Sequence, residues 1–142
     1  MKKKKILIVD DEPNILFVIS QAFQDDYCVI TAPGGEKALE LMKDERPDFV
    51  FLDIKMPGLS GIEVLARIKT TGASPVVWML TGNDELETAI ETLREGAAGY
   101  LTKPFDLAQI RMVVSATFDT QTMKERHDSS GDKPWHVKKD KQ

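Results

Sequence analysis

Residues 6–13 read Ile-Leu-Ile-Val-Asp-Asp-Glu-Pro, and this stretch decides the fold class. Four apolar residues in a row predict a short strand buried on both faces. Two aspartates follow at once, and Pro13 suits the first turn of a helix, where its missing N–H costs nothing. The stretch therefore predicts a strand that ends in acids and leads directly into a helix.

The same alternation of a short apolar run and a helical pattern recurs along the chain. Further strands are predicted at Val29–Ile30, Phe49–Leu52, Val76–Leu80 and Tyr100–Leu101. Between them, apolar residues recur at the spacing of one helix face. Apolar strands separated by amphipathic helices indicate a parallel sheet covered on both faces. We expect an α/β fold of the flavodoxin-like, doubly wound (βα)5 type, with a parallel five-stranded sheet in the order 2-1-3-4-5.

Length and composition suit one globular domain with a short tail. The chain has 142 residues, of which 42% are hydrophobic and 30% charged, and its net charge is −4. This balance argues against direct nucleic-acid binding and gives no reason to expect a membrane surface. The apolar periodicity fades after Phe118. We expect the domain to span residues 1–120, and residues 121–142 to extend the last helix into a flexible charged tail.

The N-terminus and the single cysteine bear on the compartment. The lysines at 2–5 precede only four apolar residues, whereas a signal peptide needs roughly 7–15. No stretch approaches the roughly 20 apolar residues of a membrane span. Cys28 cannot form an internal disulfide, and we expect it to be a small buried side chain. These features favour a cytoplasmic protein.

Polar residues follow the predicted strands at the points where the strands end. Asp10 and Asp11 follow the first strand, Asp53 the third, and Lys103 the fifth, while Thr81 ends the fourth. In open parallel sheets, ligands bind beyond the carboxyl ends of the strands, at the point where the strand order reverses. Three carboxylates would then meet in one pocket, beside a hydroxyl and an ammonium group.

Three neighbouring carboxylates repel one another unless a cation joins them. An open site with oxygen ligands suits Mg²⁺, which binds one or two carboxylates, several waters and a phosphate. One carboxylate then stays free to act as a nucleophile, and Asp can accept a phosphoryl group covalently. Lys103 and Mg²⁺ would neutralise charge on that group, and Thr81 would donate a hydrogen bond to it.

Four stretches in this order carry a resemblance to a known family. They are Ile-Leu-Ile-Val-Asp10-Asp11-Glu12-Pro13, Asp53-Ile-Lys-Met-Pro57-Gly58-Leu-Ser-Gly61, Leu80-Thr81-Gly82 and Tyr100-Leu-Thr-Lys103-Pro104-Phe105. Together they resemble the receiver domain of bacterial response regulators, over about residues 5–118.

The resemblance implies a phospho-acceptor and a set of metal ligands. Asp53 would take the phosphoryl group. Asp11 would bind Mg²⁺ directly and Asp10 largely through water, and Asp53 and the backbone carbonyl of Lys55 would complete the protein ligands. The donor would be a sensor histidine kinase or a histidine phosphotransfer protein.

The resemblance also implies how the signal leaves the site. Lys103 would contact the phosphoryl group, and the Lys103–Pro104 peptide bond is cis in the family. Thr81 would be the switch hydroxyl and Tyr100 the switch aromatic. Their movement would alter the face made by the fourth helix, the fifth strand and the fifth helix, which a downstream protein would bind.

Each motif alone has a simpler explanation. Asp10 and Asp11 could favour a helix N-terminus, Asp53 could belong to a turn, and Thr81 could cap a helix. Tyr100 could be an ordinary strand aromatic. Together these explanations require several coincidences at one end of the sheet, and we therefore prefer the common site.

Two other functions share parts of this pattern. A Mg²⁺-dependent phosphohydrolase would also use an aspartyl nucleophile, but Asp53-Ile54-Lys55 lacks a second acid to act as general acid. A flavodoxin-like cofactor binder would share the fold without explaining three converging acids. We expect a phospho-acceptor that is not an enzyme, beyond its own phosphorylation and intrinsic dephosphorylation.

The surroundings of the site refine this expectation. The tail is shorter than a DNA-binding output domain, so we expect a stand-alone receiver that signals by protein contact. Ala97-Ala98-Gly99 lacks the acids that often precede the switch aromatic, which favours a monomer or weak dimer. Lys55 and Asn83 could lie over the phosphoryl group and slow its attack by water.

Overall fold

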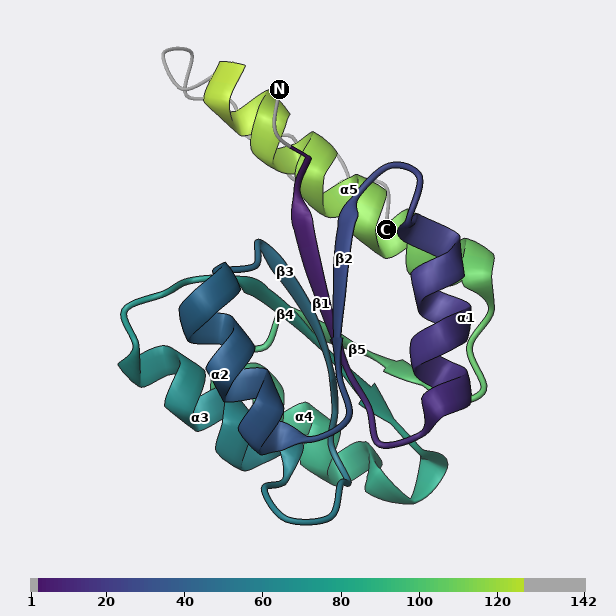
Figure 1. Cartoon of the computed structure of the whole chain (residues 1–142), viewed down its shortest axis with the longest axis vertical. Coiled ribbons are helices and arrows are strands. Elements are labelled where there is room, and N and C mark those ends of the chain that lie inside the picture. Colours follow the sequence, from purple (N-terminus) through teal and green to yellow (C-terminus); the bar gives the residue numbers. More distant parts are fainter. Residues whose placement is uncertain (1–2, 127–142) are drawn as a thin grey trace. The chain divides into compact units, whose positions relative to one another are not determined.

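The structure is a computed structural model that describes residues 3–126 (Figure 1). Strands and helices alternate along the chain. They are β1 (Lys5–Val9), α1 (Pro13–Phe23), β2 (Cys28–Ala32), α2 (Gly35–Glu45), β3 (Phe49–Asp53), α3 (Gly61–Thr70), β4 (Val76–Thr81), the short 3-10 helix η1 (Asn83–Glu85), α4 (Leu86–Arg94), β5 (Gly99–Thr102) and α5 (Leu107–Arg126). The strands form one sheet in the order β2-β1-β3-β4-β5, and all four pairings are parallel. The predicted fold class and strand order are confirmed.

The chain divides into two compact units, which we describe separately. The first extends to Leu107 and contains the sheet and α1 to α4. The second begins at Ala108 and contains nearly all of α5. No helix within residues 3–126 combines the length and the apolar character that crossing a membrane requires.

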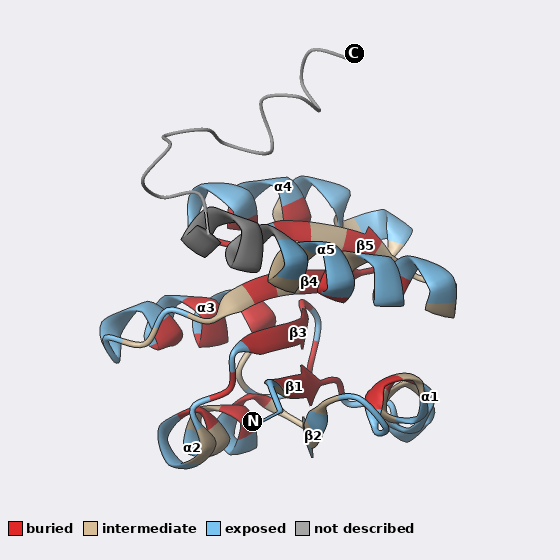
Figure 2. Ribbon diagram, turned by 90° about the horizontal axis from the view of Figure 1, so that it is seen from above, coloured by how far each residue is buried: buried red, intermediate tan, exposed pale blue. Residues whose placement is uncertain are grey.

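The central strands are buried because both sheet faces are covered (Figure 2). Every residue of β3 is buried, as are the last four residues of β1. Within the first unit, α2 and α3 lie on one side of the sheet and α1 on the other (Figures 1 and 2). On the α1 side, the Phe23 ring stacks on Phe51 with centroids 6.2 Å apart. A fully buried side chain of this kind contributes roughly 1.5–3 kcal/mol, so the sheet centre is the firmest part of the unit.

The opposite face of the sheet packs against α2, α3 and α4 in a continuous core. Its buried members from the helices are Ala38 and Met42 in α2, Val64, Leu65 and Ile68 in α3, and Ala89 in α4. Packing against these helices fixes the inner strands β1, β3 and β4, whose carboxyl ends lie at the same end of the sheet.

β2 is an edge strand, and this position corrects one expectation. Cys28 is exposed, although its apolar neighbours predict a buried side chain. β2 pairs only with β1 within the described sheet, and Cys28 is its first residue, so packing covers this end poorly. The prediction of a buried thiol is wrong.

The turn from β3 into α3 fixes the position of the carboxyl end of β3 through close backbone contacts. Gly61 N donates to the Ile54 carbonyl oxygen at 2.8 Å, and a side chain on Gly61 would overlap the Asp53 carbonyl oxygen. Ser60 and Glu63 cap α3 reciprocally: Ser60 N donates to Glu63 Oε1 at 3.0 Å, and Glu63 N donates to Ser60 Oγ at 3.3 Å. The Ser60 N–H also lowers the pKa of Glu63. The capped helix thus holds Gly61 against the backbone of Asp53.

The predicted domain boundary at residue 120 stays a prediction. α5 continues past residue 120 to Arg126. The predicted flexible tail from residue 127 onward lies outside the described residues.

Candidate functional site

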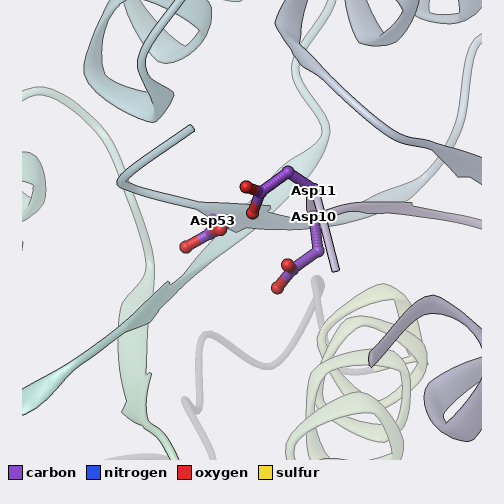
Figure 3. Close-up of side chains that lie close together, drawn as sticks. All are labelled: Asp10, Asp11 and Asp53. Carbon is purple, nitrogen blue, oxygen red and sulfur yellow. The ribbon is translucent and has the colours of Figure 1, made fainter. Parts of the chain in front are cut away.

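Three aspartates lie together at the carboxyl ends of β1 and β3 (Figure 3). One carboxylate oxygen from each of Asp10, Asp11 and Asp53 lies within 4.8 Å of the others. Asp10 is fully buried and Asp53 is 3% exposed, whereas Asp11 is exposed. β1 and β3 are neighbours in the sheet, so their ends meet where the strand order reverses. Within residues 3–126, no other group of three such ligands lies this close together.

Lys103, which directly follows the edge strand β5, also lies beside the acids. Its Nζ lies 3.0 Å from Asp10 Oδ2, 3.5 Å from Asp53 Oδ1 and 3.3 Å from Glu12 Oε1. The Lys103–Pro104 peptide bond is cis, as the resemblance implies. Lys103 N also donates to the Thr81 carbonyl oxygen at 2.7 Å, which ties the end of β5 to the end of β4. The predicted ammonium group is therefore in the pocket.

Burial and mutual repulsion shift the pKa values of these groups. Burial, and then the charge of Asp10, raise the pKa of Asp53 from 3.8 to about 7. Burial also raises the pKa of Asp10, although the Glu12 N–H and Lys103 act against this rise. For Lys103, burial lowers the pKa, but the acids outweigh it and the pKa is raised overall. The cluster holds more negative charge than one lysine neutralises.

These residues fit a hard divalent cation. Three carboxylates against one ammonium leave a charge of −2 when all are ionised (−3 + 1). Asp10 Oδ2 is buried and accepts no well-aligned hydrogen bond within the described residues, so it relies on the Lys103 ammonium. Carboxylates around an open position, with an exposed Asp11, suit Mg²⁺, which keeps several waters.

The other predicted site residues surround this pocket. Thr81 is fully buried, and its Oγ1 donates to the Gly82 carbonyl oxygen at 3.0 Å. Tyr100 is partly buried and packs against the core shared by α2, α3 and α4. The Lys55 N–H donates to Asp53, while its side chain points outward and pairs with Asp84 at 3.9 Å. The structure brings the carboxylates of Asp10, Asp11 and Asp53 together and places the Lys103 ammonium within 3.5 Å of Asp10 and Asp53. The Lys55 side chain lies at the rim.

Two acids at the site were not predicted as site residues. Glu12 also forms an ion pair with the Lys103 ammonium. Glu12 is part of the motif at residues 6–13, but no role for it was predicted from the sequence. Glu85 accepts a hydrogen bond from Gly82 N at 3.1 Å, directly after the predicted switch hydroxyl. Glu85 stands three residues after Gly82, directly before a helix, which is the acidic half of a capping box and could have indicated this contact.

A doubly wound parallel sheet with an acidic, lysine-containing pocket where the strand order reverses defines a class of small α/β proteins, and the acids of this pocket suit a divalent cation. The particular family follows from comparison with known proteins. Residues 6–115 match the family model of the response regulator receiver domain. The chain therefore belongs to this family, whose members are signalling domains of two-component systems that bind Mg²⁺ in an acidic pocket.

Relatives of known sequence are response regulators of different length. The chain is 39% identical over 115 residues to sporulation initiation phosphotransferase F of Bacillus subtilis, covering 80% of this chain and 93% of that protein. It is 40% identical over 124 residues to the regulatory protein AtoC of Escherichia coli, covering 84% of this chain but only 26% of AtoC. The chain thus matches about the whole of one relative and about a quarter of another.

Solved structures agree with the family. A receiver domain protein from Clostridium thermocellum superposes with a TM-score of 0.78 at 32% identity, covering 84% of this chain and 98% of that one. The receiver domain of NtrX from Brucella abortus gives a TM-score of 0.76 at 33% identity, covering 81% and 98%. Both match the chain as receiver domains.

Proposed function

We propose that this chain is a phospho-acceptor that takes a phosphoryl group on Asp53 and signals through protein contact. The observation that carries the proposal is the position of Asp53, a buried carboxylate beside two other aspartates and 3.5 Å from an ammonium. A carboxylate in such a place can attack phosphorus while its neighbours hold a cation. The phosphoryl donor is a sensor histidine kinase or a histidine phosphotransfer protein.

The residues of the site have separate roles in this reaction. Asp11, Asp53 and the Lys55 carbonyl would hold Mg²⁺ directly and Asp10 largely through water, and the ion would supply positive charge for the phosphoryl oxygens. An Asp53 oxygen forms the new bond to phosphorus, and the donor's phosphorus–nitrogen bond breaks, leaving its electron pair on the imidazole. Lys103 neutralises charge on the group in transfer.

Phosphorylation then alters the surface through Thr81 and Tyr100. The group adds nearly two negative charges, and Thr81 turns its hydroxyl from the Gly82 carbonyl toward a phosphoryl oxygen. Tyr100 moves into the space that Thr81 leaves, and the surface of α4 and β5 changes by a population shift between two forms. The exposed apolar residues Leu86, Ile90 and Leu93 on α4 support a binding role for α4.

The proposal includes the form in which the chain acts. We infer a cytoplasmic receiver, a monomer or weak dimer, that binds a downstream protein rather than DNA or a membrane. Sporulation initiation phosphotransferase F, which the chain matches over 93% of its length, shows that a protein little longer than the matched receiver occurs among the relatives.

Incubation with acetyl phosphate and Mg²⁺, followed by intact mass measurement, tests the proposal. We expect wild type to gain one phosphate and Asp53→Asn to gain none. Asp44→Asn, which changes an exposed carboxylate of α2, is the matched control and should gain one phosphate. Equal phosphate on Asp53→Asn and wild type would contradict the proposal, and steady hydrolysis of small phosphate esters would favour the phosphohydrolase.

A further inference from the structure

The carboxyl end of β4 holds two hydrogen-bond donors that both have acceptors within the β4–α4 loop (residues 81–85). Thr81 Oγ1 donates to the Gly82 carbonyl oxygen at 3.0 Å, and Gly82 N donates to Glu85 Oε1 at 3.1 Å. Glu85 N donates in turn to the Gly82 carbonyl oxygen at 3.1 Å, which closes the loop. Neither donor can serve an incoming group until its present hydrogen bond breaks.

The alternation of β4 shows where the Gly82 N–H points. The Leu80 carbonyl oxygen accepts a hydrogen bond from the β3 side at 3.1 Å, and the Thr81 carbonyl oxygen accepts one from the β5 side at 2.7 Å. The Gly82 N–H belongs to the same peptide group as the Thr81 carbonyl and points in the opposite direction, so it faces the β3 side. Leu80 pairs with Asp53, so the Gly82 N–H faces the carboxyl end of β3, where Asp53, the proposed phosphoryl acceptor, lies.

We propose that Glu85 competes with the phosphoryl group on Asp53 for the Gly82 N–H, and so limits phosphorylation. The inference rests on the proposed function and concerns the regulation of the same site. A phosphoryl group has three acceptor oxygens and nearly two negative charges, so it seeks donors and repels a nearby carboxylate. The loop then has two forms: Gly82 bound to Glu85 without phosphate, and Gly82 bound to a phosphoryl oxygen with it.

Glu85 is better suited to this competition than its neighbour Asp84. The pair between Asp84 and Lys55 is 3.9 Å long, and both side chains are about three-quarters exposed, so the pair contributes little. Glu85 is partly buried, and its carboxylate accepts a backbone N–H with a direct hydrogen bond. A hydrogen bond to a charged acceptor is the stronger kind, and its loss changes an equilibrium by about tenfold.

Three variants separate the competition from a general charge effect. Glu85→Ala removes the acceptor, and Glu85→Gln keeps an acceptor oxygen without its charge. Glu87→Gln removes the same charge two residues further along, in the first turn of α4. With acetyl phosphate below saturation and Mg²⁺ present, we expect Glu85→Ala to be phosphorylated about three to ten times faster than wild type. The phosphorylation rate of Glu85→Gln should fall between those of Glu85→Ala and wild type. The rate of Glu87→Gln should stay within about twofold of wild type.

The Gly82 amide gives a readout that a structural role alone would not move. By NMR, its N–H signal in wild type should shift on phosphorylation, and its hydrogen exchange should be faster in unphosphorylated Glu85→Ala than in Glu87→Gln. Phosphorylation of Glu85→Ala at the rate of Glu87→Gln would overturn the inference. If Glu85→Ala lowers the midpoint of thermal unfolding, the phosphorylation rate of Glu85→Gln is used as the test instead. A rate for Glu85→Gln equal to that of wild type would then overturn the inference. Absence of phosphate on wild type would instead overturn the proposed function itself.

Discussion

Replacing Asp53 with Asn should stabilise the metal-free protein at neutral and alkaline pH. Asp53 is 3% exposed and lies beside Asp10 and Asp11, so its charge is unfavourable in the fold without a cation. Its pKa rises from 3.8 to about 7 for this reason. An acid with a raised pKa in the folded state holds its proton longer there than in the unfolded chain. The wild type therefore loses stability as the pH rises from about 4 to about 7, and Asp53→Asn avoids this loss.

The size of the effect follows from the same shift. Each pKa unit corresponds to about 1.4 kcal/mol, so a rise from 3.8 to about 7 corresponds to about 4 kcal/mol above pH 7. Asp10 and Lys103 adjust their own protonation and positions when the charge disappears, which reduces the gain. We expect Asp53→Asn to be more stable by about 2–4 kcal/mol at pH 8 and by about 1 kcal/mol at pH 5.

Urea unfolding in the presence of a chelator, followed through Trp78 of β4, measures this difference at both pH values. The control Asp44→Asn should match wild type, because its carboxylate is exposed on α2. Mg²⁺ should then stabilise wild type more than Asp53→Asn, since the cation needs the carboxylate. The reasoning is wrong if Asp53→Asn is no more stable at pH 8, or if its advantage grows toward pH 5.

Three further substitutions test other contacts. Gly61→Ala should lower the free energy of unfolding by about 1–3 kcal/mol and slow phosphorylation, because the new methyl group meets the Asp53 carbonyl oxygen; urea unfolding and intact mass would measure both, and an unchanged phosphorylation rate would contradict it. Thr81→Ala should accept phosphate but lose the shift of α4 amide signals in NMR that phosphorylation causes in wild type; equal shifts in both would refute the switch. Lys55→Ala should shorten the lifetime of the phosphorylated form, measured by the decay of the phosphoprotein mass; a longer lifetime would count against shielding by this side chain.

Much of the site could be predicted from the sequence because strand ends are local features. The apolar runs before Asp10 and Asp53 identify buried strands, and the geometry of parallel sheets then brings their ends to one edge. The prediction that these acids lie beside Lys103 is confirmed by distances of 3.0 and 3.5 Å. No detail of side-chain packing was needed for that conclusion.

What the sequence could not predict depends on which side chains meet in space. Glu12 and Glu85 look like ordinary acids near helix starts, and only the fold shows that one contacts Lys103 and the other Gly82. Cys28 lies in an apolar run, but its strand is at the sheet edge and its first residue stays exposed. The raised pKa of Asp53 likewise depends on burial, which spacing along the chain does not determine.

The most direct test of the central claim is to locate the phosphoryl group on the chain. Wild type would be phosphorylated with acetyl phosphate and Mg²⁺, reduced with borohydride to convert an aspartyl phosphate into homoserine, digested, and sequenced by tandem mass spectrometry. We predict homoserine at residue 53 in the Mg²⁺ sample, and unmodified aspartate there when a chelator replaces Mg²⁺. Homoserine at Asp10 or Asp11, or equal modification of residue 53 without Mg²⁺, would contradict the account.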